Sequence, residues 1–205
     1  MTQTFLHLGC GPRRKNATTR GFNRDEWQEL TLDPDPAFKP DHVAKLTDLS
    51  AVASGSVDAL FCSHSLEQLY VHEVAPALAE FRRVLKPEGF AVITGSDLQG
   101  VAELIVADKL TETAYESAVG PIRPIDIVFG HAGAIAAGNL RMVRHCGFTQ
   151  KVLAATLQAA GFRGFASARR PAPLLDLWVI ATPEPKSDAA LRELAAQHFP
   201  YAAKK

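Results

Sequence analysis

Apolar residues occur along this chain in short runs, separated by polar segments and turn residues. Such runs, when they are bounded by Gly, Pro or Asp, are typical of strands buried in a parallel sheet. They predict strands at 4–8, 26–32, 43–46, 57–62 and 90–94. In one longer segment the apolar residues lie four, three and four positions apart, at Val74, Leu78, Phe81 and Leu85. This spacing predicts a helix over 72–85 that ends before Pro87.

The second half of the chain adds further helices and a hairpin. Helical patterns predict helices at 98–110, 151–160 and 188–198. Residues 162–168 and 174–181 have the pattern of a closing pair of strands, joined through 169–173. The insertion at 97–147 contains many Gly and Pro residues, and connections of that length are uncommon unless they are functional. We therefore expect a lid there, within a single domain of residues 1–205.

Alternating strands and helices predict an α/β fold with a doubly wound, mostly parallel sheet. In such a sheet ligands bind beyond the carboxyl ends of the strands, at the point where the strand order reverses. Gly9-Cys10-Gly11 follows the first predicted strand and Asp33 follows the second. Both features therefore fall on the side of the sheet where a ligand is expected.

Composition excludes several classes of protein. The 205 residues are 47% hydrophobic and 21% charged, and 22 basic residues balance 22 acidic ones. A nucleic-acid-binding protein usually has a basic excess, so we expect no nucleic-acid partner. The three cysteines are far apart in sequence, which argues against a disulfide framework, and neither Cys nor His spacing indicates a metal site. Without a signal sequence or an apolar stretch of roughly 18 residues, we expect a cytoplasmic protein that does not contact a membrane.

The turn after the first strand has the chemistry of a ligand site. Gly9 and Gly11 let the backbone turn sharply and let a ligand approach where a Cβ would collide, although a plain tight turn has the same pattern. A dinucleotide-binding turn would have a third glycine where Arg14 stands, which disfavours a nicotinamide-dependent oxidoreductase. Asp33, 22 residues after Gly11, can accept hydrogen bonds from both hydroxyls of a ribose. The alternative is an ordinary turn aspartate, and Asp35 takes the ribose role if the strand ends later.

Asp48 and Leu49 follow the third predicted strand. A carboxylate at that position can accept a hydrogen bond from the exocyclic amine of adenine, while the leucine covers a face of the ring. An aspartate that caps a helix or a turn is the alternative interpretation.

Four segments, in order, resemble the motifs of class I S-adenosylmethionine-dependent methyltransferases. They are Phe5-Leu-His-Leu-Gly-Cys-Gly11, Ser56-Val-Asp-Ala-Leu-Phe-Cys-Ser-His-Ser-Leu-Glu-Gln68, Phe81-Arg-Arg-Val-Leu-Lys-Pro-Glu-Gly-Phe90 and Ala160-Gly-Phe162. The resemblance covers about residues 4–182. It implies a seven-stranded Rossmann-like sheet with a reversed terminal strand, S-adenosylmethionine as the cofactor and S-adenosylhomocysteine as its product.

The resemblance also assigns residues at the strand ends to the cofactor: Gly9, Cys10 and Gly11 to its methionine part, Asp33 to its ribose, and Asp48 and Leu49 to its adenine. Ser63 and His64, at the end of the fourth strand, would line the face where the methyl group is transferred. His7 departs from the family, which often has an acid there. The helix that usually follows the first motif looks reduced, because 13–23 has no helical pattern.

A base is needed only if the methyl acceptor must lose a proton, and three histidines are candidates for that role: His64, His131 and His145. His64 ends the fourth strand, and the other two lie in the predicted lid. A structural role is the alternative for each, and Asp126 and Arg141 are weaker lid candidates.

These features predict a methyltransferase that acts on a small molecule and is either a monomer or a homodimer. The acceptor itself is not encoded in any recognisable motif. A non-catalytic S-adenosylmethionine-binding sensor or partner subunit is the main alternative, because intact cofactor motifs do not prove catalysis. A nicotinamide-dependent oxidoreductase is the second alternative.

Overall fold

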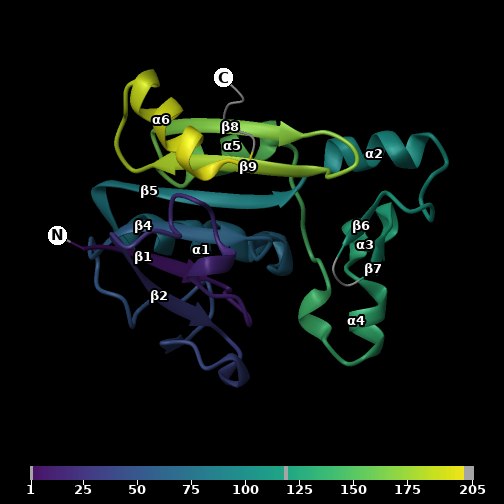
Figure 1. The fold of residues 1–205 in the computed structure, drawn as a ribbon, viewed down its shortest axis with the longest axis horizontal. Coiled ribbons are helices and arrows are strands. Elements are labelled where there is room, and N and C mark those ends of the chain that lie inside the picture. The colour runs from purple at the N-terminus through teal and green to yellow at the C-terminus, as the bar shows by residue number, and fades with distance from the viewer. Residues whose placement is uncertain (1, 118–119, 201–205) are drawn as a thin grey trace.

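A computed structural model of the protein describes residues 2–117 and 120–200 (Figure 1). Its main sheet contains seven strands: β1 (Gln3–Leu8), β2 (Trp27–Asp33), β3 (His42–Val43), β4 (Val57–Ser63), β5 (Leu85–Ser96), β8 (Gly164–Arg170) and β9 (Asp176–Thr182). The strand order is β3-β2-β1-β4-β5-β9-β8. Neighbouring strands from β3 to β5 are parallel, whereas β9 runs antiparallel to both β5 and β8. The predicted doubly wound sheet with a reversed terminal strand is confirmed.

Helices cover both faces of the sheet, because alternate residues of each strand point to opposite faces. Helices α1 (Val71–Val84) and α5 (Gln150–Ala159) pack on the face that carries Leu6 and Leu8. Helix α6 (Asp188–His198) packs on the opposite face, and its bounds are those predicted.

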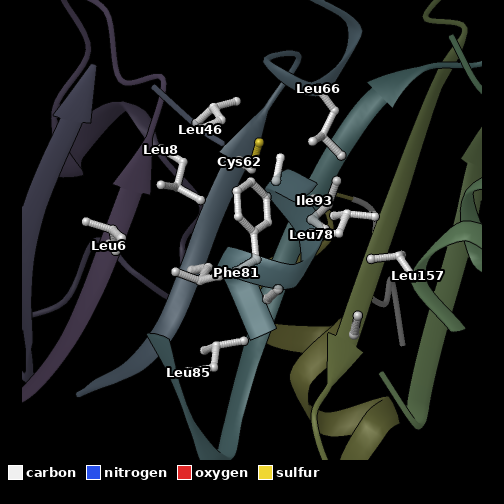
Figure 2. Close-up of a cluster of buried hydrophobic side chains, with 14 of the residues drawn as sticks. Leu6, Leu8, Leu46, Cys62, Leu66, Leu78, Phe81, Leu85, Ile93 and Leu157 are labelled. Carbon is white, nitrogen blue, oxygen red and sulfur yellow. The ribbon is translucent and has the colours of Figure 1, made fainter. Parts of the chain in front are cut away.

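The larger core lies between α1, α5 and the sheet. Figure 2 shows the Phe81 ring on α1 directed toward the strands, with Leu6 and Ile93 among the side chains near it. All four apolar positions of the predicted helix are buried: Val74, Leu78, Phe81 and Leu85. The helical spacing therefore identified the face of α1 that packs on the sheet.

The second core, on the opposite face of the sheet, is rich in aromatic residues. A loop, rather than a helix, follows β1 and contributes to it. Residues 13–25 contain only a single 3-10 turn, at Lys15–Ala17, which confirms the expected reduction of that helix. Phe22, from this loop, stacks on Phe5 with 4.3 Å between ring centroids. The His198 ring of α6 lies 4.4 Å from the Phe22 ring. The loop and α6 together cover a face of the sheet with aromatic rings.

Several elements differ in length from the prediction. Strand β3 has two residues rather than four, because a turn closed by Asp48 N–H and Lys45 O takes the chain away from the edge of the sheet. Strand β5 begins at Leu85, earlier than expected. Helix α2 (Leu98–Val106) ends before the expected Leu110, because Asp108 has a left-handed backbone with φ of 58°.

The segment between β5 and α5 forms a small unit beyond the carboxyl ends of the parallel strands (Figure 1). It contains α2, strands β6 (Tyr115–Ser117) and β7 (Gly120–Ile122), and helices α3 (Pro124–Phe129) and α4 (Ala132–Ala136). Val101, Ile122 and Ile127 form its own apolar cluster together with Leu175. Within residues 2–117 and 120–200, no helix is both long and apolar enough to cross a membrane.

Candidate functional site

Two glycines open the carboxyl end of β1 to a cavity. Gly9 and Gly11 have φ of 61° and 54°, in the left-handed region that favours glycine. A Cβ on Gly9 would lie 2.3 Å from Ser65 Oγ, so this residue also permits close packing of the loop after β4. A Cβ on Gly11 would meet nothing within 4 Å. Both residues line a cavity of about 500 Å³, and Gly11 leaves room in it for a ligand.

Asp33 closes β2 beside this turn. Its carboxylate accepts hydrogen bonds from Gly11 N–H at 2.8 Å and from Asp35 N–H at 2.9 Å. The side chain is almost completely buried yet lines the cavity. The structure therefore joins the two predicted strand-end features, which are 22 residues apart in the sequence, in one wall.

At the position where the family often has an acid, His7 pairs with an acidic residue of the neighbouring strand β2. His7 Nδ1 lies 2.7 Å from Glu29 Oε1 on β2, and the second oxygen of Glu29 accepts the Lys15 N–H at 2.8 Å. The basic loop that follows is tied down as well. The Arg14 guanidinium donates to Gly11 O at 3.0 Å and also to Phe38 O. These contacts hold the glycine turn in place without a helix behind it.

The two residues predicted to bind adenine, Asp48 and Leu49, do not line the cavity. Asp48 is exposed and accepts a hydrogen bond from Ser50 N–H at 3.1 Å, whereas Leu49 is completely buried in the core. Neither residue lines the cavity, which is lined at this place by Lys45, Leu46 and Thr47. The early end of β3 causes this displacement, because the chain reaches the cavity before residue 48.

The two remaining residues predicted to bind the cofactor lie behind the cavity wall. Ser63 Oγ lies 2.9 Å from Thr94 Oγ1 on β5, and Ser65, two residues further on, lines the cavity in its place. Cys10 is buried between Gly9 and Gly11, and this burial raises the pKa of its thiol to about 11. Its thiol is therefore neutral at physiological pH.

His64 is held in an unusual conformation at the end of β4. Its φ of 54° is uncommon for a residue other than glycine, and its Nδ1 lies 3.2 Å from Glu67 Oε2. Glu67 is buried and also accepts bonds from Ser96 N–H and from the Arg144 guanidinium. Burial opposes ionisation of Glu67, but the His64 hydrogen bond and the His64 and Arg144 charges outweigh it and lower its pKa to about 2. Glu67 thus holds the His64 side chain and ties Arg144, in the segment between α4 and α5, to the loop after β4.

The structure separates the three predicted histidines. His145 lines the cavity, and its backbone N–H donates to the backbone carbonyl of Glu67 at 2.8 Å. Its ring stacks on Tyr70 with 4.1 Å between ring centroids. His64 is partly exposed, but it is not part of the cavity wall. His131 caps α4 by accepting the Ala134 N–H at 3.1 Å, so it has a structural partner away from the cavity.

Residues 139–145, which we call the strap, pass along the cavity between α4 and α5. Residues 139–143 and His145 line the cavity. Arg141 forms salt bridges with Asp35 and, at 3.7 Å, with Asp33, and its guanidinium lies 4.9 Å from the Phe38 ring centroid. Asp126, the other weak candidate, is paired with Arg123 at the start of α3. No local pattern indicates the partners of Arg141, because Asp35 is 106 residues away in the sequence.

Comparisons with known proteins agree with this geometry. Residues 6–93 match the family described as the methyltransferase domain. A comparison with curated proteins finds no match. Among solved structures, a protein from Pyrococcus horikoshii is 13% identical, with a TM-score of 0.59 over 90% of this chain and 83% of that chain.

Two similar structures are named as methyltransferases. The 1,6-didemethyltoxoflavin-N1-methyltransferase of Burkholderia thailandensis, with bound S-adenosylhomocysteine, is 19% identical and has a TM-score of 0.56 over 88% of this chain and 71% of its own. A SAM-dependent methyltransferase from Archaeoglobus fulgidus is 13% identical, with a TM-score of 0.54 over 88% of this chain and 86% of its own. At such identities these structures establish the fold.

The cavity fits the cofactor of this fold. Its volume of about 500 Å³ lies in the range of small-molecule sites. Gly11 provides a cradle that a Cβ would fill, Asp33 provides a carboxylate, and Leu46 and Leu69 provide apolar surface. Residues 6–93 thus resemble the methyltransferase domain family, and the chain has the fold of the similar methyltransferase structures.

Proposed function

We propose that this enzyme transfers the methyl group of S-adenosylmethionine to a small molecule bound in the cavity beside the strap. The observation that carries the proposal is that the glycine turn, Asp33 and His145 line one and the same cavity. A cavity of about 500 Å³ suits a small ligand rather than a nucleic acid or a protein surface. Three free cysteines fit a reducing, cytoplasmic compartment.

In this proposal each group of lining residues binds a different part of the cofactor. When bound, the cofactor supplies a methyl group that its sulfonium charge already activates. Asp33 binds the ribose hydroxyls, and the backbone at Gly9 and Gly11 receives the methionine part. Leu46, rather than Leu49, packs against the adenine. The strap excludes water, and alignment of the reactants can lower the barrier by roughly 7–11 kcal/mol.

His145 is the proposed base for an acceptor that must lose a proton. It is the one predicted histidine on the cavity wall, and the bond from its N–H to Glu67 O fixes its backbone. Stacking on Tyr70 limits the orientations of its ring, so that a ring nitrogen can take the proton from the acceptor.

Calorimetric titration with S-adenosylhomocysteine tests the cofactor site. Asp33→Asn should weaken binding at least tenfold, because a hydrogen bond to a charged group contributes about 1.5–3 kcal/mol. Asp48→Asn is the matched control, since that exposed carboxylate does not line the cavity, and it should bind like the wild type. NAD should not bind. Equal losses in the two variants, both still folded, would contradict the assignment of the ribose carboxylate.

Turnover of a panel of small alcohols, amines, thiols and carboxylic acids, followed by S-adenosylhomocysteine release, tests catalysis. His145→Phe keeps an aromatic ring against Tyr70 and should retain cofactor binding but lose turnover of acceptors that must be deprotonated. His131→Asn keeps a capping side chain on α4 and should turn over normally. Tight cofactor binding without turnover of any panel member would favour the sensor alternative.

A further inference from the structure

The strap is anchored at one end to the loop after β4. His145 N–H donates to Glu67 O at 2.8 Å, and the Arg144 side chain reaches both Glu67 and, at 2.6 Å, Ser96 Oγ. Arg144 N–H also donates to Phe129 O of α3. Backbone and side-chain contacts therefore hold residues 144–145 firmly beside the sheet.

At the other end of the strap, one side chain makes the ion pairs and the ring contact that the described residues form with the β2 side of the cavity. Arg141 pairs with Asp35 and Asp33 and lies over the Phe38 ring. The Arg141 side chain is 40% exposed, whereas the Asp33 side chain is 7% exposed. A partly exposed ion pair is weak, so this end of the strap is the easier one to release.

The guanidinium occupies the part of the cavity where the proposed function places adenosine. A guanidinium is planar, stacks on aromatic faces and donates hydrogen bonds to carboxylates. Adenosine has the same two features, because its base is planar and its ribose hydroxyls donate hydrogen bonds. Both groups would therefore use the Phe38 ring and the Asp33 carboxylate.

We infer that Arg141 is a latch that competes with the adenosine part of the cofactor for Asp33 and Phe38, and that cofactor binding releases the strap at this point. This inference rests on the proposed function. The anchored end at Glu67 stays in place, so the strap pivots there while His145 remains beside the cavity. The latch lowers the apparent affinity for the cofactor in proportion to the fraction of molecules that are latched.

Removal of the latch should tighten binding. Arg141→Met keeps an unbranched apolar side chain but no charge, and it should lower the Kd of S-adenosylhomocysteine about two- to fivefold. Adenosine alone should show the same change, because the competition concerns the nucleoside. The advantage of the variant should shrink as salt is raised from low to high concentration, since salt screens the ion pair of the wild type.

Arg123→Met is the matched control. Arg123 also belongs to the lid, pairs with a carboxylate and is 39% exposed, but it does not line the cavity. Its Kd should equal that of the wild type, and thermal unfolding should show that both variants are folded. An unchanged or weaker affinity of Arg141→Met for both ligands would overturn the latch. Failure of the folded wild type and of Arg141→Met to bind S-adenosylhomocysteine would instead overturn the proposed function.

Discussion

His198, at the end of α6, should make the stability of the protein depend on pH. The residue is 2% exposed, and its Nδ1 lies 2.7 Å from Thr19 Oγ1. Its ring packs against Phe22 and Phe90, with centroid distances of 4.4 and 5.1 Å. Among the described residues, its Nε2 has no hydrogen-bond partner. Burial, with a smaller effect from the charge of Arg24, lowers the pKa of His198 from 6.5 to about 4.

The sign of the effect follows from proton binding. In the unfolded chain the imidazole binds a proton near pH 6.5, whereas in the folded protein it does so only near pH 4. Between these values the unfolded state holds more protons, so the free energy of unfolding falls as the pH is lowered. The full loss is about 3 kcal/mol, of which about 2 kcal/mol falls between pH 7 and pH 5.

Urea unfolding at pH 7 and pH 5 measures this loss. His198→Phe keeps an aromatic ring but cannot bind a proton. Its free energy of unfolding should therefore fall by about 2 kcal/mol less than that of the wild type between pH 7 and pH 5. His72→Gln, at an exposed position of α1, should keep the pH dependence of the wild type. The reasoning is refuted if His198→Phe and the wild type lose equal stability, or if NMR titration of the wild type gives His198 a pKa near 6.5.

Three further predictions concern the core and the cavity. Phe81→Ala should lower the free energy of unfolding in urea by about 3–5 kcal/mol, because the ring is completely buried against the sheet. Gly9→Ala should lower Tm more than Gly11→Ala, since only the former places a Cβ against Ser65, whereas Gly11→Ala should mainly weaken cofactor binding in calorimetry. Glu67→Gln should lower the free energy of unfolding at pH 7 by about 3 kcal/mol, because it leaves a partly buried guanidinium without its carboxylate. Equal effects of the two glycine variants, or a neutral Glu67→Gln, would contradict these assignments.

The spacing of apolar residues correctly predicted the helices that have a clear apolar face. Val74, Leu78 and Phe81 of α1 are all buried, as is Leu85 directly after it, and α6 has the predicted bounds. The glycine turn and Asp33 were also predicted to share an edge, because parallel strands end on the same side of a sheet. Their direct hydrogen bond shows that this rule was sufficient.

The cavity lining after β3 shows where local patterns fail. Strand β3 lies at the edge of the sheet and pairs only with β2, so its length depends on few contacts. It ends at Val43, which brings Lys45, Leu46 and Thr47 to the cavity and leaves Asp48 in solvent. A shift of two or three residues was enough to change which side chains line the cavity.

The sequence by itself thus determined the fold class, the order of the main elements and the residues at the strand ends, because spacing and turn residues act over a few positions. Only the tertiary structure decided which residues of the segment between β5 and α5 line the cavity. The partners of Arg141 and Arg144 lie 106 and 77 residues away in the sequence. It also placed His145 in the cavity wall and His131 on a helix cap. These contacts depend on how the segment between β5 and α5 packs on the sheet. The spacing of residues along the chain does not predict that packing.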